Sequence, residues 1–405
     1  MKRIIGLAAL ALALACGTAQ AQYSDGVIKI GVMNDMSGLY ADLSGPGGVE
    51  AAKMAVEDFG AEKKGMKVEI ISGDHQNKPD VGSNLARSWI DTQHVDVIVD
   101  VPTSSVALAV SQVVREKNKV LLASGPATSD LTGPQCSPNT IHWTYDTWAL
   151  ANGTGKAIVK TGGDTWFFLT ADYAFGHALE RDTAAVVEKN GGKVVGKVRT
   201  PFPGTDFSSF LLQAQSSKAK IIGLANAGGD TINSIKQAAE FGIVKGGQNL
   251  AGLLVFITDV HSLGLQTAQG LIFTSAFYWD RDEASRAFAK RFAPRYKGNM
   301  PTMVQAGIYS SVLHYLKAVE ALKSDGNGDG KVVVAKMKEL PTDDPLFGKG
   351  TVRADGRKLH DMYLLEVKKP EESKGPWDYL KVRATIPAAE AFRPLNEGKC
   401  PLVGG

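Results

Sequence analysis

The chain has 405 residues, more than one hydrophobic core usually serves, so two lobes are expected. Its formal net charge is +3, and removal of a leader that carries Lys2 and Arg3 would leave +3 − 2 = +1. This near-balance argues against a nucleic-acid-binding surface and against electrostatic binding to a membrane, because both need a strongly basic patch.

The first residues have the pattern of a secretory signal peptide. A basic start precedes an apolar run over 4–15, which is too short to span a bilayer. The segment 19–21 (Ala-Gln-Ala) then has small residues at the two positions that a signal peptidase recognises. We therefore predict a cleaved signal peptide over 1–21 and an exported mature chain. Lipoprotein processing at Cys16 is the alternative.

The first part of the mature chain alternates strand and helix patterns. Short apolar runs rich in β-branched residues predict strands at 27–32, 68–71, 95–99 and 120–122. Between them, apolar residues at helical spacing predict helices around 49–59, 81–89 and 106–114. Repeated strand–helix–strand units of this kind build a parallel sheet that is covered by helices on both faces.

The pattern restarts after a linker near 144–146. We predict strands at 166–169, 193–198, 221–224, 253–257 and 271–273, with helices around 178–186, 210–214 and 230–241. After Trp279 the pattern becomes helical without strands, so these helices must dock on an existing lobe. Short strands and turns follow from Lys349 onward. The fold class is therefore α/β with two lobes in series.

Motifs that would indicate catalysis or a bound cofactor are missing from the sequence. There is no nucleophile elbow, no H-E-x-x-H zinc motif and no phosphate-binding loop. The segment 325–330 matches the first half of a calcium loop, but Lys336 stands where the bidentate Glu is required. We expect no enzyme activity, no metal and no cofactor.

Hydroxyl-bearing and small residues follow two strands of the first predicted sheet. The segment 102–105 follows the third strand, and the segment 124–129 follows the fourth. Ligands of open α/β sheets bind at the carboxyl ends of strands, and hydroxyls with free backbone N–H groups suit a carboxylate. Ordinary helix capping by Thr103 and Ser104 is the alternative. The candidate ligand-binding residues here are Thr103, Ser104, Ser124, Gly125, Ala127 and Thr128.

The second predicted sheet supplies further candidates after its strands. Tyr173 and Asn226 each follow one strand, and Asp259 follows another. A carboxylate such as Asp259 pairs with a ligand ammonium where water is excluded. An exposed or helix-capping Asp is the commoner case, so both interpretations stay open.

Two cysteines remain after the predicted signal peptide. In an oxidising compartment an even number favours a disulfide, here between Cys136 and Cys400. The alternative is two free thiols. The bond would hold the C-terminal tail against the end of the first lobe.

Several segments in order resemble one family of binding proteins. They are Ile30–Val32 with Asp35–Gly38, Asp74 with Pro79, Pro102–Ser105, Ala127–Thr128 with Asp130–Thr132, and Asp172–Gly176. Together these segments resemble the periplasmic ligand-binding proteins of the branched-chain amino acid transport type. The resemblance extends over nearly all of the mature chain.

The resemblance implies a type I periplasmic binding protein with two doubly wound, Rossmann-like lobes and a three-crossing hinge. The implied boundaries are 22–145 plus 281–350 for lobe 1, 146–280 plus 351–385 for lobe 2, and 386–405 for a C-terminal tail. The implied role is capture of an amino acid, branched-chain or otherwise apolar, for an ABC-type transporter in the periplasm. The expected partners are a membrane permease and an ATPase, and we expect a monomer. A ligand-sensing module for a separate receptor is the alternative role.

The resemblance also implies residue roles. A ligand carboxylate would be held by Thr103, Ser104, Ala127 and Thr128. Asp259 would take the ammonium, Phe175 falls where the family has a pocket Tyr, and Phe277 falls near a pocket wall. The chain departs from the family at two Tyr positions, where it has Leu43 or Ser44 and Ala227 or Gly228. An aromatic carboxylate is therefore the alternative ligand.

Overall fold

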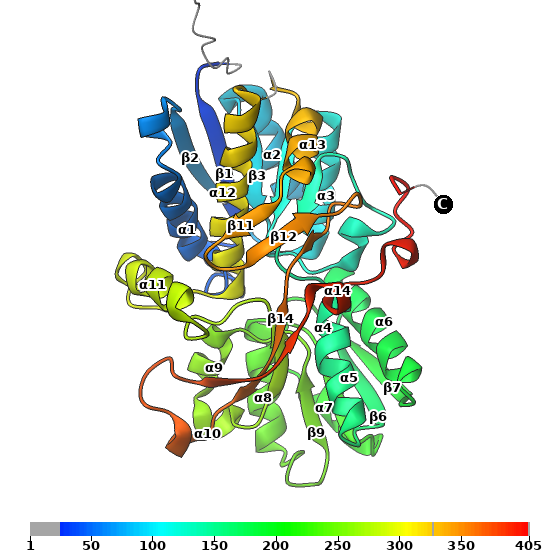
Figure 1. Cartoon of the computed structure of the whole chain (residues 1–405). Coiled ribbons are helices and arrows are strands. Elements are labelled where there is room, and N and C mark those ends of the chain that lie inside the picture. The colour runs from blue at the N-terminus through cyan, green and yellow to red at the C-terminus, as the bar shows by residue number, and fades with distance from the viewer. Residues whose placement is uncertain (1–24, 326–327, 404–405) are drawn as a thin grey trace, which may run out of the picture.

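The computed structural model describes residues 25–325 and 328–403, so the predicted signal peptide lies outside the described residues. Two α/β lobes lie one above the other in Figure 1. Each lobe contains its own parallel sheet with helices packed against it. Among the described helices, none combines the length and the apolar character needed to cross a bilayer.

Lobe 1 contains a five-stranded parallel sheet with the order β2-β1-β3-β4-β5. Its central strands β3 and β4 are buried throughout, as expected for a sheet covered on both faces. The strands are β1 (Ile28–Asn34), β2 (Val68–Asp74), β3 (Val97–Asp100), β4 (Val120–Ala123) and β5 (Thr140–His142). The helices between them are α1 (Gly45–Phe59), α2 (Pro79–Gln93) and α3 (Ser104–Glu116).

Lobe 2 contains a four-stranded parallel sheet with the order β7-β6-β8-β9. Its strands are β6 (Thr165–Ala171), β7 (Lys193–Thr200), β8 (Ile221–Ala225) and β9 (Asn249–Gly252). Its helices are α4 (Thr147–Leu150), α5 (Lys156–Lys160), α6 (Ala174–Lys189), α7 (Ser208–Ser216), α8 (Gly229–Glu240), α9 (Ile257–Leu263) and α10 (Leu265–Ala268).

Two predicted strands of this second sheet are corrected by the structure. The run 253–257 is no strand, because β9 ends at Gly252 and the chain continues through a loop into α9. This run is apolar because every one of its residues is buried. The strand predicted at 271–273 is β10 (Ile272–Ser275). It pairs antiparallel with β14 (Met362–Val367) and does not extend the parallel sheet. The last strand, β15 (Leu380–Ile386), pairs with β14 in turn.

The helices after Trp279 return to lobe 1, as the resemblance implies. Helix α12 (Met303–Leu322) is almost entirely buried and packs against α1, and α13 (Gly330–Glu339) packs against α12. The remaining elements are α11 (Glu283–Phe292), β11 (Thr342–Asp344), β12 (Gly348–Val352), β13 (Lys358–Leu359) and α14 (Ala388–Ala391). The chain thus passes between the lobes after β5, after β10 and after β13 (Figure 1), and the predicted fold class is confirmed.

The predicted disulfide is present. Cys136 and Cys400 are bonded, with 5.7 Å between their Cα atoms and a sequence separation of 264. The tail makes a further contact with the same region, because Arg393 Nη2 donates to Ser129 O at 3.1 Å. The C-terminal segment is therefore fastened to lobe 1.

Removing this disulfide is expected to destabilise the exported chain. A bond that closes a long loop restricts the unfolded chain, and such bonds typically contribute about 2–4 kcal/mol. The Cys136→Ser, Cys400→Ser double variant should lose about that much free energy of unfolding, measured by denaturant titration. An unfolding midpoint equal to that of the oxidised parent would contradict this prediction.

Candidate functional site

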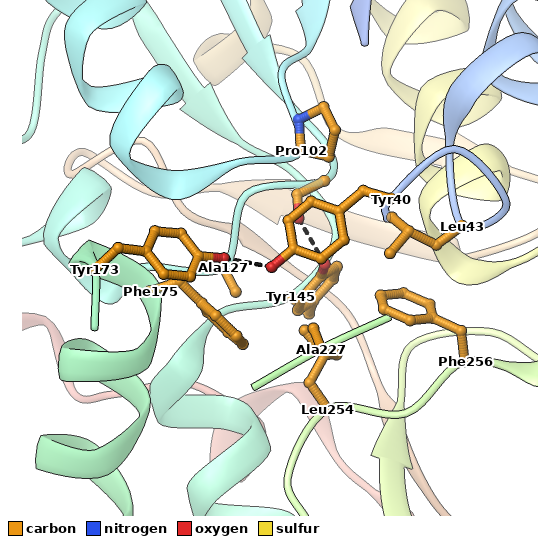
Figure 2. A pocket seen from close by; sticks show the side chains of 11 residues that line it. Tyr40, Leu43, Pro102, Ala127, Tyr145, Tyr173, Phe175, Ala227, Leu254 and Phe256 are labelled. Atoms are coloured by element: carbon orange, nitrogen blue, oxygen red, sulfur yellow. Dashed lines mark hydrogen bonds between the residues drawn. The ribbon is translucent and has the colours of Figure 1, made fainter. Parts of the chain in front are cut away.

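A small pocket lies where loops from the two lobes meet (Figure 2). The loops follow the carboxyl ends of both parallel sheets, the usual ligand position in open α/β folds. The free space measures about 10 Å³, enough for roughly one water molecule. We call this space the interlobe pocket, and it is lined by Tyr40, Leu43, Pro102, Gly125, Ala127, Tyr145, Tyr173, Phe175, Ala227, Leu254 and Phe256.

Asp35 fixes the loop that carries Tyr40 into the pocket. Its Oδ1 accepts the Gly38 N–H at 2.7 Å, and its Oδ2 accepts the Tyr40 N–H at 2.9 Å. Asn77 Nδ2 also donates to Asp35 Oδ2 at 2.7 Å. Because this carboxylate accepts these three hydrogen bonds and a longer one from the Ser37 N–H at 3.4 Å, it holds the loop in one shape. The neighbouring Thr103 hydroxyl donates in turn to Asn77 Oδ1.

The predicted carboxylate-binding residues form one buried cluster on lobe 1. Ser104 Oγ accepts the N–H groups of Ala127 at 3.3 Å and of Thr128 at 3.2 Å. Ala127 lines the interlobe pocket, and Ser104 lies in the layer behind it. Gly125 lines the pocket too, and its carbonyl accepts the Tyr145 hydroxyl at 2.5 Å. The loops after β3 and β4 therefore converge, as predicted.

Aromatic side chains join the two lobes across the pocket. The hydroxyls of Tyr40, from lobe 1, and Tyr173, from lobe 2, share a hydrogen bond (Figure 2). Phe202 stacks on Tyr173 with 3.9 Å between the ring centroids. A backbone hydrogen bond also joins the two lobes, because the Gly229 N–H of lobe 2 donates to Leu39 O of lobe 1 at 3.4 Å. The described conformation is thus closed.

Three buried carboxyl groups surround the pocket without a basic partner. Burial raises the pKa of Asp100, of Asp230 and of Asp259 to about 7 in each case. Their partners are neutral donors: the Ser44 hydroxyl, the Gly204 N–H and the Phe256 N–H respectively. Within residues 25–325 and 328–403, no Lys, Arg or His forms an ion pair with any of the three. The charge of each of these three acids is therefore left without a basic side chain to compensate it.

The second-lobe candidates occupy different places. Tyr173 and Phe175 line the interlobe pocket. Asp259 lies in the first turn of α9, where its Oδ2 accepts the Phe256 N–H at 2.9 Å. Phe256 lines the interlobe pocket, so Asp259 is about one helical turn from the pocket wall. Burial and then the Asp100 carboxyl raise the pKa of Tyr145, and Asp259 raises it further.

Thr103, Ser104, Thr128 and Asp259 lie behind the pocket wall and do not line it, and three further predicted residues lie elsewhere. Ser124 Oγ shares a 3.4 Å hydrogen bond with Ser311 on α12. Asn226 is bonded within lobe 2, where its Nδ2 donates to Ser234 Oγ at 3.0 Å. Phe277 lines a second small cavity near the hinge, which shares Phe256 with the interlobe pocket.

Several lining residues were missed in the sequence. Leu254 and Phe256 belong to the run that the apolar pattern assigned to a strand. Tyr40 stands inside a loop whose shape depends on Asp35, and loop composition alone does not show which side chain points inward. The aromatic concentration near the first crossing was the signal for Tyr145.

Comparisons with known proteins agree with this architecture. The profile of a family described as periplasmic binding protein matches residues 27–375. A periplasmic binding protein from Burkholderia mallei, solved by crystallography, is 56% identical with a TM-score of 0.90, over 93% of this chain and 99% of that one. A branched chain amino acid ABC transporter periplasmic ligand-binding protein from Burkholderia xenovorans is 41% identical with a TM-score of 0.82, over the same shares. The Leu/Ile/Val-binding protein homolog 6 of Brucella melitensis is 25% identical over 381 residues, 92% of this chain and 94% of that protein.

Proposed function

Because the chain belongs to the periplasmic binding protein family, the solute-binding components of ABC transporters, we propose that it captures an amino acid between its two lobes. The observation that carries this choice of solute is the set of buried acids Asp100, Asp230 and Asp259, which no basic side chain of the described chain neutralises. A ligand ammonium would compensate one of them, whereas an aromatic carboxylate would only add negative charge. The acids therefore favour an amino acid over the alternative ligand.

In the proposed complex, lobe 1 binds the carboxylate and lobe 2 binds the ammonium. In the described conformation the N–H groups of Ala127 and Thr128 both donate to Ser104 Oγ, and the Thr103 hydroxyl donates to Asn77 Oδ1. In the proposed complex the ligand carboxylate replaces Ser104 Oγ and Asn77 Oδ1 as the acceptor of these donors. A group of neutral N–H and O–H donors suits a bound carboxylate. Asp259 takes the ammonium in this proposal.

Access to the pocket requires the lobes to separate. Tyr40, Phe175 and Phe256 are at most 3% exposed, and the remaining space is far smaller than an amino acid. The crossings after β5, β10 and β13 supply the hinge for such a motion. We propose that the closed, loaded form is the one that docks on a membrane permease, with an ATPase driving import, and that the chain acts as a monomer in the periplasm.

A thermal-shift screen of the mature chain tests the proposed solute class. A ligand that binds only the folded chain stabilises it, by about 2.7 kcal/mol at a ligand concentration of 100 Kd. This stabilisation raises the unfolding temperature. We expect one or more amino acids to raise it, and benzoate and hydroxybenzoates to leave it unchanged. Stabilisation by the aromatic acids without stabilisation by any amino acid would contradict the proposal.

Amino-acid binding is also expected to depend on pH. Burial holds the pKa of Asp259 at about 7 in the closed conformation, and an ammonium bonds to the ionised form, so binding lowers this pKa and releases a proton below neutral pH. The affinity should therefore fall as the pH drops below about 7, by up to about tenfold per pH unit for one linked proton. Calorimetric titrations at a series of pH values measure this. An affinity that stays constant or rises on acidification would contradict the assignment.

A further inference from the structure

The first turn of α8 lies at the rim of the interlobe pocket. Ala227 lines the pocket, and the Gly229 N–H donates to the carbonyl of Leu39 on the opposite lobe. Asp230 is part of this turn and is only 2% exposed. Its carboxyl group is therefore enclosed at the place where the lobes meet.

One oxygen of Asp230 has no partner in the described part of the chain. Oδ1 accepts the Gly204 N–H at 3.1 Å, whereas Oδ2 is buried and accepts nothing there. Burial raises the pKa of Tyr40 and of Tyr173, and the nearby Asp230 carboxyl raises both further. The unused oxygen thus belongs to a group close to two pocket-lining phenols. A buried acceptor without a donor is costly, and such a group calls for an explanation.

The two phenols leave a proton unused as well. Tyr40 and Tyr173 each carry one hydroxyl proton, and one hydrogen bond between them uses only one of the two. Across residues 25–325 and 328–403, neither hydroxyl has another protein partner. The pocket-lining phenols therefore offer an unused donor, and Asp230 in the adjoining first turn of α8 offers an unused acceptor. Leu254 and Phe256 make the pocket wall elsewhere apolar.

We infer that this end of the pocket recognises an amino-acid side chain that both donates and accepts hydrogen bonds, namely an amide or a hydroxyl. The side-chain donor bonds to Asp230 Oδ2, and the side-chain oxygen accepts the spare phenol proton of the Tyr40–Tyr173 pair. This inference rests on the proposed amino-acid function and narrows it. The expected solute is therefore an amino acid with a small polar side chain, in place of one with a purely apolar side chain.

Isosteric amino acids separate this inference from the proposed function. Asparagine and leucine have nearly the same shape, as do threonine and valine, and each pair differs in its polar groups. Calorimetry on the wild-type mature chain should show that asparagine binds at least about tenfold tighter than leucine, or that threonine binds at least about tenfold tighter than valine. The polar ligand gains a strong hydrogen bond to the Asp230 carboxylate, whereas the apolar ligand leaves that buried carboxylate without a donor. Equal or tighter binding of leucine and valine would overturn the inference and leave amino-acid binding intact. Binding of no amino acid would remove the basis of both.

The Asp230→Asn variant tests the residue itself. The Gly204 N–H should hold the amide oxygen, so the variant would place an NH₂ group where Oδ2 lies, facing the ligand donor. The preference for the polar isostere should then fall from about tenfold to about onefold. Asp206→Asn is the matched control, because Asp206 is exposed in the same lobe and accepts the Ser208 N–H. A preference that survives in Asp230→Asn would overturn the assignment, and the wild-type ratios decide the matter if that variant does not fold.

Discussion

Replacing Asp259 by asparagine is expected to weaken amino-acid binding by at least about 30-fold, because removing one partner of a buried charge pair costs 2 kcal/mol or more. The change should leave the fold intact. Asp259 Oδ2 accepts the Phe256 N–H, and an asparagine oxygen can accept the same bond. Calorimetry with the amino acid that binds the parent chain tightest gives the ratio of dissociation constants.

Two controls make this result specific to the ammonium. The deaminated analogue of the same amino acid should lose little affinity in Asp259→Asn, because it has no group for Asp259 to bind. The Asp42→Asn variant removes an exposed acid that itself raises the pKa of Asp259, so it tests for a general effect of nearby charge. We expect it to change binding little. Equal losses for the amino acid and its deaminated analogue would show that Asp259 does not hold the ammonium.

Substituting Gly228 by alanine is expected to weaken binding of any solute by about 5- to 150-fold, which corresponds to 1–3 kcal/mol of overpacking. A Cβ at this position would lie 2.5 Å from Leu39 O and 3.0 Å from Tyr40 Cδ1. Both atoms belong to the other lobe, so the collision arises only when the lobes are closed. The variant should therefore bind weakly although none of its proposed ligand contacts has changed.

Gly242→Ala is a control for a positive φ in lobe 2. Because Gly228 also has ψ −130°, where an L-residue is strained further, the free energy of unfolding of the ligand-free Gly228→Ala chain is measured beside its affinity. Both glycines have positive φ, +56° at Gly228 and +65° at Gly242, and both lie in lobe 2. A Cβ at Gly242 would meet nothing within 4 Å, so only strain is added there. Affinity measured for both variants separates strain from blocked closure. A loss in Gly242→Ala as large as that in Gly228→Ala would contradict the closure account.

The sequence predicted the parts of this molecule that depend on local pattern. Strand β4 is a continuous apolar run, and β3 is apolar up to its last residue, Asp100, because both faces of a parallel sheet are buried. Such runs can therefore be recognised as strands in the sequence. The pattern failed at Leu253–Ile257, where burial between the lobes makes a loop and a helix start as apolar as a strand. It also gave no signal for β5, which has only three residues.

The candidate site was predictable where it follows strand ends and unpredictable where it depends on tertiary contacts. The loops after β3 and β4 could be located because the carboxyl ends of parallel strands meet at one edge. Tyr40 could not, because its direction follows from the bonds that Asp35 makes to Gly38, Tyr40 and Asn77. Asp230 depends on the packing of α8 against the loop that contains Gly204.

Small-angle X-ray scattering of the mature chain with and without a saturating amino acid measures lobe closure directly. A pocket with room for about one water cannot admit an amino acid unless the lobes part, so the ligand-free chain should sample open conformers. We predict that the amino acid lowers the radius of gyration and brings the scattering curve to that of the closed structure. Identical curves in the presence and absence of a bound amino acid would contradict capture between two closing lobes.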